Sequence, residues 1–278
     1  MKARSYSPIV PNLPVIASKT DPSSSRRVVL LGASNLTRGI STVVETSQRA
    51  LGQPLEFLVA MGHGRSYGVE SCVFGKKISG IFSCGLWPAL AAPSRCTTSA
   101  LITDIGNDIL YGMPVQQIVT WVEACVNRLR DADAEIILTQ LPLDRARRIT
   151  PWQFRIMRSL LYPRNRQTLD HVVGQTRELA EQLCELAEKQ QITLIPVNYA
   201  WFGFDPIHIR RRFWSIAWCE ILAHWPSAAP IGQPASGSLV RWLYLSSLTP
   251  ERRRVWGIKQ RTRQPAGRLF DGSTIALY

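Results

Sequence analysis

The sequence has no long apolar run. Its uninterrupted apolar stretches, such as Val28 to Leu31, are far shorter than the roughly 18 to 20 residues that a membrane-crossing helix needs. Near the N-terminus, Pro8, Pro11 and Pro14 interrupt an apolar patch, and no small-residue cleavage site follows it. We therefore expect neither a transmembrane helix nor a cleaved signal peptide, and we interpret the first residues as a loose leader.

Metal-binding cysteine patterns are also missing. The six cysteines of the 278-residue chain include no CxxC pair, and no histidine lies beside them at the spacing of metal ligands. This argues against a structural zinc site. Because no secretion signal is visible, we predict free thiols rather than disulfides, and a cytoplasmic protein.

Acidic residues are scarce, with 20 Asp and Glu against 33 Lys and Arg, which gives a net charge of +13. Much of the excess lies in residues 206–278, which hold eleven basic and three acidic residues. Aromatic residues are interleaved with this charge at Trp242, Tyr244 and Trp256. The pattern leaves two interpretations open: a surface for an anionic partner such as nucleic acid, or a solvated extension that its aromatic side chains hold against the core.

Composition divides the chain into three parts. Residues 1–26 are rich in Pro and Ser without a helix or strand period, which predicts a flexible N-terminal arm. Residues 27–225 have the apolar and amphipathic segments of one globular domain. A Pro- and Ala-containing segment at 226–230 then leads into a basic C-terminal extension, 226–278.

Short apolar runs alternate with amphipathic segments through the central part. This alternation is typical of parallel strands with helices on both faces, so we predict an α/β fold with a doubly wound, mostly parallel sheet in three α/β/α layers. The predicted strands are 28–31, 55–60, 100–103, 135–139 and 192–197, and the predicted helices are 37–51, 114–130 and 167–190. Two segments, 71–99 and 142–166, have no clear rhythm; the second is basic and Pro-rich and could form a lid or flap.

Polar residues follow four of the predicted strands. In a parallel α/β sheet, reactive groups gather at the carboxyl ends of the strands, so these positions are candidates for chemistry. They read Gly32-Ala33-Ser34-Asn35, Gly62-His63-Gly64-Arg65-Ser66, Ile105-Gly106-Asn107-Asp108 and Asp205-Pro206-Ile207-His208.

These positions supply every group that ester hydrolysis needs. Ser34, at a strand-to-helix turn, is the candidate nucleophile, and its own N–H would face the same place as its hydroxyl. His208 is the candidate base, and Asp205, three residues before it, can orient the imidazole. Asn107 offers a side-chain amide donor to an oxyanion, and Gly64 a backbone N–H that no Cβ obstructs.

The four blocks, in this order, resemble the SGNH hydrolases, also called the GDSL esterase and lipase family. In that family the serine lies in a Gly-Asp-Ser block, a glycine follows the second strand, a Gly-x-Asn-Asp block follows the third, and an Asp-x-x-His block comes near the end. The matching positions here are Gly32-Ala33-Ser34, Gly64, Gly106-Asn107-Asp108 and Asp205-Pro206-Ile207-His208. The resemblance implies a flavodoxin-like fold and acyl ester hydrolysis by a serine nucleophile, without metal or organic cofactor.

Two departures from the family pattern bear on the site. Ala33 stands where the family has an aspartate, which removes a carboxylate and predicts altered loop packing without loss of the chemistry. In the second block, Gly62, Gly64 and Gly68 compete for the oxyanion role; spacing favours Gly64, with Gly62 next.

The leading hypothesis is therefore a serine esterase that acts on a small ester, with Ser34, Asp205 and His208 as its triad. An O-acyltransferase would use the same residues, so it stays an alternative. A third hypothesis makes the domain a catalytically idle scaffold for a basic, nucleic-acid-binding tail. Arg38 and Arg65 flank the site and could favour an anionic substrate, although solvated arginines at helix starts are the more ordinary interpretation.

Overall fold

A computed structural model describes residues 26–73, 75–94, 96–142, 152, 154, 167–203, 205 and 207–278. The predicted N-terminal arm, apart from Arg26, lies outside the described residues. So does nearly all of the predicted flap at 142–166.

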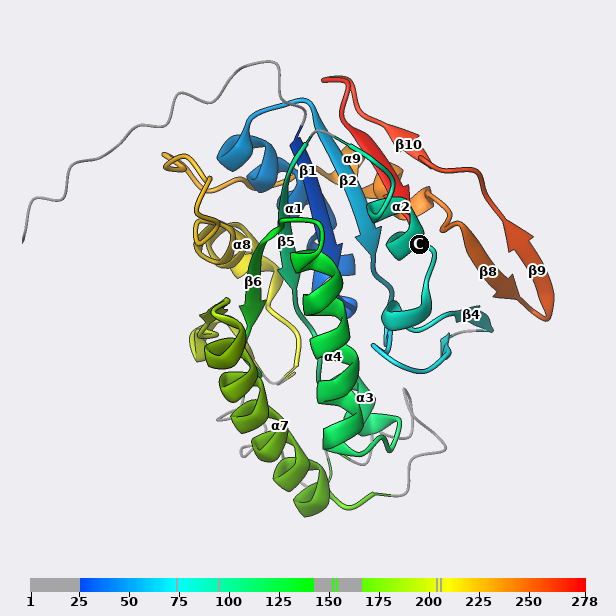
Figure 1. Cartoon of the computed structure of the whole chain (residues 1–278), viewed down its shortest axis with the longest axis vertical. Coiled ribbons are helices and arrows are strands. Elements are labelled where there is room, and N and C mark those ends of the chain that lie inside the picture. Colours follow the sequence, from blue (N-terminus) through cyan, green and yellow to red (C-terminus); the bar gives the residue numbers. More distant parts are fainter. Residues whose placement is uncertain are drawn as a thin grey trace, which may run out of the picture.

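A seven-stranded sheet forms the centre of the structure (Figure 1). Its order is β10-β11-β2-β1-β5-β6-β7, and every neighbouring pair is parallel except β10 with β11. The five strands β2-β1-β5-β6-β7 have the order of a flavodoxin-like fold, so the predicted fold class is confirmed. The strands are β1 (Arg26–Leu31), β2 (Leu55–Ala60), β5 (Thr97–Ile102), β6 (Glu135–Thr139), β7 (Thr193–Ile195), β10 (Gly267–Arg268) and β11 (Thr274–Leu277).

Helices cover both faces of this sheet, so β1 is inaccessible from either side. Val28 to Leu31 are fully buried, as an apolar run without alternation predicts. One face is covered by α1 (Ser34–Leu51), α8 (Trp214–Leu222) and α9 (Leu239–Ser247), and the other by α2 (Leu86–Leu90), α4 (Val115–Arg130) and α7 (Leu169–Gln190). In the described part of the chain, no helix is both long and apolar enough to cross a membrane.

The main helices and strands lie within a few residues of their predicted bounds. Helix α1 begins earlier than predicted, at Ser34, and β5 begins at Thr97. The predicted irregular segment 71–99 contains short elements that are too brief to show a period. These are β3 (Ser71–Val73), β4 (Lys76–Ile78), the 3-10 turn η1 (Ile81–Ser83) and α2.

Residues 226–278 pack on the central domain. Strand β11 pairs in parallel with β2, and Leu245 of α9 is buried in the core on the α1 side. Strands β8 (Arg252–Val255) and β9 (Ile258–Arg261) join β3 and β4 in a second, antiparallel sheet of order β3-β4-β8-β9. The C-terminal segment therefore contributes strands to both sheets.

Candidate active site

Three predicted site residues meet at the carboxyl end of β1. Ser34 Oγ lies 2.8 Å from Nε2 of His208, and His208 Nδ1 lies 2.6 Å from Oδ2 of Asp205. The other carboxylate oxygen of Asp205 accepts hydrogen bonds from the N–H groups of Ile207 (3.2 Å) and His208 (3.3 Å). This is the connectivity of a serine, histidine and aspartate triad.

The charge of Asp205 is stabilised by its surroundings. Burial alone would raise the pKa of this carboxyl, but the hydrogen bond from His208, the positive charge of His208 and the two backbone N–H groups together lower it. Arg38, one turn into α1, has Nη1 3.9 Å from Oδ2 of Asp205. Asp205 therefore stays ionised and can hold the imidazole in the tautomer that presents Nε2 to the serine.

Ser34 is the first residue of α1, at the positive end of that helix. The preceding Ala33 occupies the cap position and makes no side-chain cap bond. The N–H groups of Ala33, Asn35 and Leu36 all donate to Oδ2 of Asp104, at 2.9, 3.0 and 3.2 Å. For the N–H of Ser34 itself, the described residues provide no acceptor.

Gly64 occupies the third position of a β-turn after β2. Arg65 N donates to Gly62 O (3.2 Å) across this turn, and Gly64 has φ of 61°, a conformation that glycine adopts without strain. The carbonyl of Gly64 accepts from the hydroxyl of Tyr111 (2.8 Å), which anchors the turn to the segment after α3 (Asn107–Leu110). No acceptor for the Gly64 N–H is found within the described ranges.

Asn107 begins α3 and points its amide toward the same turn. Its Nδ2 donates to the carbonyl of Arg65 (3.1 Å), which fixes the orientation of the amide group. Ser34, Gly64 and Asn107 thus come from three loops that follow three adjacent parallel strands.

Asp108 ties the second loop to the third. Its fully buried carboxylate accepts from the hydroxyl of Ser66 and from the N–H groups of Tyr67 (2.8 Å) and Gly68 (3.2 Å). Burial raises the pKa of Asp108, although these hydrogen bonds act in the opposite direction. The Gly68 N–H is occupied here, which leaves Gly62 and Gly64 as the competing oxyanion glycines.

Comparison with known proteins gives matches to solved structures alone. No family model matches the chain, and no curated protein matches it. The esterase EstA from Pseudoalteromonas sp. is 15% identical over 71% of this chain and 95% of that chain, with a TM-score of 0.45. A carbohydrate acetylesterase family member from Sinorhizobium meliloti is 16% identical (71% and 95% covered, TM-score 0.47), and a lipolytic G-D-S-L family protein from Veillonella parvula is 15% identical (72% and 98%, TM-score 0.45).

Two of these proteins are described as esterases, and one as a member of the lipolytic G-D-S-L family. At these identities and TM-scores the likeness to GDSL esterases carries no argument about chemistry, so the interpretation of the site rests on its own contacts. Ala33, where the sequence departs from the family pattern, contributes to the site through its backbone. At this position the side chain is a methyl group, and the backbone N–H of Ala33 donates to Asp104 of the third loop.

Asp104 and Asn35 are two site residues that the sequence alone did not identify. Asn35 Nδ2 donates to Asp104 Oδ1 (2.7 Å) and to Ile207 O (2.9 Å), and its Oδ1 accepts from Ile209 N (2.8 Å). The position of Asp104, directly after a predicted strand, was the available signal. Asn35, next to Ser34, could not be identified because nothing in the sequence shows its contact with Ile209, 174 positions away.

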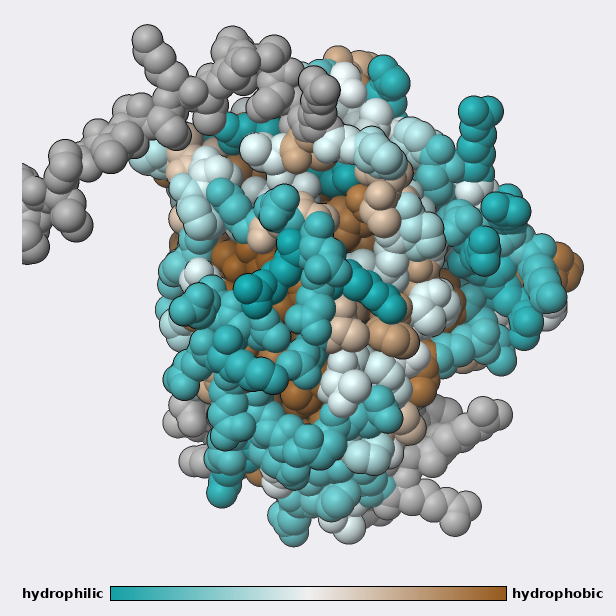
Figure 2. All heavy atoms as spheres, in the orientation of Figure 1, coloured by the Kyte–Doolittle hydropathy of each residue, from teal (hydrophilic) through white to brown (hydrophobic). Residues whose placement is uncertain are grey.

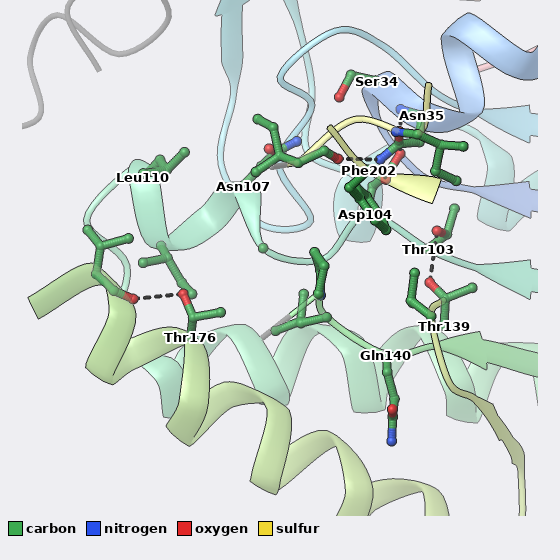
Figure 3. Close-up of a pocket in the computed structure, with 18 of the residues that line it drawn as sticks. Ser34, Asn35, Thr103, Asp104, Asn107, Leu110, Thr139, Gln140, Thr176 and Phe202 are labelled. Atoms are coloured by element: carbon green, nitrogen blue, oxygen red, sulfur yellow. Dashed lines mark hydrogen bonds between the residues drawn. The ribbon is translucent and has the colours of Figure 1, made fainter. Parts of the chain in front are cut away.

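A cavity of about 130 Å³ opens beside Ser34 and Asn107 (Figure 3). Figure 3 shows Leu110 and Thr176 at one end and Thr103 and Thr139 at the other. Most of its lining is apolar and comes from α3, α7 and the ends of β6 and β7, with Ile109, Leu110, Leu141, Phe154, Val172 and Val173 among the lining side chains. The cavity therefore suits an apolar group of a molecule that binds next to Ser34.

His63 and Arg65 occupy different environments next to this site. Partial burial and the positive charges of Arg38, His208 and Lys76 lower the pKa of His63, which keeps its ring neutral near pH 7. Arg65 is buried beneath the turn, and its Nη1 donates to the carbonyls of Met61 and Tyr278. Arg65 therefore supports the loop from below and does not face a substrate.

No cluster of three metal-ligating side chains is found among the described residues.

Proposed function

We propose that this chain is a serine esterase in which Ser34 attacks the carbonyl carbon of a carboxylic ester. The observation that carries the proposal is the continuous contact from Ser34 Oγ to His208 Nε2 and from His208 Nδ1 to Asp205. Any one of the motifs could be a cap or a turn. A purely structural role rarely requires that a hydroxyl, an imidazole and a carboxylate contact one another in one line at the end of a strand.

The reaction would proceed in two halves. In the first, His208 takes the proton of Ser34 as its oxygen attacks, and the tetrahedral oxyanion receives hydrogen bonds from the N–H groups of Ser34 and Gly64 and from Asn107. The intermediate collapses, and His208 returns the proton to the departing alcohol. In the second half, water attacks the acyl-enzyme with His208 as base, and the carboxylic acid leaves as Ser34 regains its proton.

The cavity favours a small apolar acyl group. Its volume of about 130 Å³ is close to that of a cavity that accommodates one benzene ring, about 150 Å³. We therefore propose that butyryl or hexanoyl esters are better substrates than palmitoyl esters. Val173→Phe should reduce activity on hexanoyl esters more than on acetyl esters, whereas the exposed Val240→Phe on α9 serves as a control that leaves the ratio unchanged.

Labelling with a fluorophosphonate probe tests the nucleophile directly. The probe should modify Ser34 in the wild type, as located by peptide mapping, and should not modify Ser34→Ala. Hydrolysis of short p-nitrophenyl esters should be lost in the same variant. Undiminished hydrolysis by Ser34→Ala would show the proposed mechanism to be wrong.

Acyl transfer to an alcohol is a second outcome for the same acyl-enzyme. An O-acyltransferase would pass the acyl group to a sugar or another alcohol in place of water. Product analysis with a mixed pool of alcohol acceptors distinguishes the two, because a hydrolase releases free acid in their presence.

Nucleic-acid binding is a second candidate function, favoured by the basic antiparallel sheet. Figure 2 shows a hydrophilic surface over β8 and β9. Seven basic residues lie on its strands: Lys76, Lys77, Arg252, Arg253, Arg254, Lys259 and Arg261. Glu70 and Glu251 pair with three of them, and the other four have no carboxylate partner in the described part of the chain. At the hairpin tip Trp256 is 80% exposed and could stack on a base.

Point substitutions are the right test of this surface, because deleting residues 226–278 would remove β11 from the central sheet. We expect oligonucleotide binding that weakens steeply with salt and falls in Arg254→Gln/Lys259→Gln. The matched control is Arg177→Gln/Lys189→Gln on the exposed face of α7. Binding that is equally weak in both double variants, or insensitive to salt, would contradict this function.

The expected cytoplasmic location stays a prediction.

A further inference from the structure

We propose that Asp104 and Asn35 act together as positioning residues that set both the oxyanion donor and the base of the esterase. The inference rests on the proposed function of Ser34 and His208. Asp104 would hold the start of α1 so that the Ser34 N–H alone faces the substrate. Asn35 would connect that carboxylate to the segment that carries His208.

The first half of the argument concerns the N–H groups at the start of α1. Three of the four consecutive N–H groups from Ala33 to Leu36 converge on one oxygen of Asp104. The remaining one belongs to Ser34, which has no acceptor among the described residues. A carboxylate at this place neutralises the positive helix end and satisfies its donors, yet leaves free the one donor that an oxyanion would need.

The backbone of Asp104 supports a specific role for its side chain. Asp104 has φ of 61°, in the left-handed region that residues with a Cβ rarely occupy. Such conformations persist where the surroundings enforce them, and they concentrate at functional sites. Here the backbone turns immediately after β5 and aims the carboxylate back across the end of β1.

The second half concerns the segment on either side of His208. Asn35 donates to the carbonyl of Ile207 and accepts from the N–H of Ile209, so it holds the backbone before and after the base. Its Nδ2 also donates to Asp104. That bond requires an acceptor at Asp104, and it fixes which end of the Asn35 amide faces each partner. The nucleophile loop and the base segment are thereby joined through one side-chain amide.

A simple helix cap would explain the three backbone bonds but not the Asn35 contacts, and two substitutions separate these roles. Asp104→Asn tolerates the left-handed backbone, but its single, uncharged acceptor oxygen would weaken the bonds to the backbone N–H groups, and its amide nitrogen would oppose Nδ2 of Asn35. Asn35→Ala leaves the Asp104 bonds to the backbone in place and removes the bonds to residues 207 and 209. As a control, Asp133→Asn changes another aspartate with positive φ, on the exposed turn after α4.

Kinetics of the purified full chain provide the first test. We expect Asp104→Asn and Asn35→Ala each to lower kcat and the rate of fluorophosphonate labelling by roughly 10- to 100-fold, with KM within about 2-fold of the wild type. The double variant should be no slower than the slower single variant, because the two residues act as one unit. A kcat within about 2-fold of the wild type in Asp104→Asn, or fully multiplicative losses in the double variant, would overturn the proposal.

Amide hydrogen exchange measured by NMR provides the second test, and it does not depend on activity. In the wild type the N–H groups of Ala33, Asn35 and Leu36 should be protected while that of Ser34 exchanges rapidly. Asp104→Asn should accelerate exchange at the three protected positions, and Asp133→Asn should not. If wild-type Ser34 is neither labelled nor active, the proposed esterase function fails. Unchanged exchange in Asp104→Asn refutes the role of Asp104 in either case.

Discussion

The imidazole of His208 lies within hydrogen-bonding distance of the Ser34 hydroxyl, at 2.8 Å, although 174 positions separate the two residues. Ser34 is fixed by the first turn of α1, and His208 lies in an irregular segment between η2 (Tyr199–Trp201) and η3 (Arg211–Phe213). The contact therefore depends on what holds that segment against the sheet. Asn35, the neighbour of Ser34, does so through its bonds to Ile207 and Ile209.

Removal of the base should abolish catalysis without unfolding the protein. For His208→Ala we expect kcat on short esters to fall by roughly 10⁴- to 10⁶-fold, because triad members act as a unit. The melting temperature should change little, since His208 contributes to the site and not to the core. His224→Ala, at an exposed helix end, is the matched control and should retain full activity. Substantial activity in His208→Ala would remove His208 from the mechanism.

The pH dependence should reflect the lowered pKa of Asp205. A carboxyl whose folded-state pKa lies below its unfolded value contributes stability that is fully present above the unfolded pKa, about 3.9. That contribution is lost as the pH falls through the folded pKa. The difference in free energy of unfolding between wild type and Asp205→Asn should thus be present at about pH 5 and should shrink below about pH 4.

Chemical denaturation of both proteins across this range measures the difference. The same substitution should lower kcat at neutral pH by up to about 10⁴-fold, because an amide can stabilise the wrong imidazole tautomer. A stability difference that grows as the pH falls below about 4 would contradict the direction of the pKa shift.

The side chain of Asn107 should matter to the transition state more than to substrate binding. We expect Asn107→Ala to lower kcat by about 10²- to 10³-fold with a small change in KM, as for loss of one oxyanion donor. Asn127→Ala, on the exposed face of α4, is the control. Steady-state kinetics on a p-nitrophenyl ester distinguish the outcomes. A rise in KM with kcat unchanged would assign Asn107 to substrate binding alone.

Asp108 should be required for stability. Asp108→Ala would leave the buried Ser66 hydroxyl and the buried Tyr67 N–H without their acceptor, whereas the Gly68 N–H would keep the Ser66 hydroxyl oxygen. We expect the free energy of unfolding to fall by more than about 2 kcal/mol. Urea denaturation checks this, with the exposed Asp131→Ala as a control that should change little. An unchanged unfolding midpoint would mean that the second loop is held by other contacts.

The C-terminal strand should unfold together with the central sheet. Ile275 in β11 is 1% exposed and packs with the core on the α1 side, so Ile275→Ala should cost about 2 to 5 kcal/mol. Unfolding should remain a single transition. The control is Val240→Ala, because that side chain on α9 is 78% exposed. A separate early transition in the Ile275 variant would instead define residues 226–278 as an independent unit.

The sequence by itself determined the fold class and the order of the chemistry. Buried strands such as Val28 to Leu31 carry an uninterrupted apolar pattern, and amphipathic helices carry a period near 3.6, so both can be recognised locally. Because parallel strands end at one edge of a sheet, the residues after each strand could also be assigned to one site. That reasoning led to Ser34, Asn107 and the Asp205–His208 pair.

Only the tertiary structure decided how those residues are held. The Asp104 bonds to the start of α1 and the Asn35 bonds around His208 join segments 68 to 174 positions apart, and no local pattern reports such contacts. The same is true of β11, a four-residue strand that takes its place in the central sheet by pairing with β2. Periodicity reflects which face of an element is buried, whereas hydrogen bonds between distant loops depend on the packing of the whole sheet.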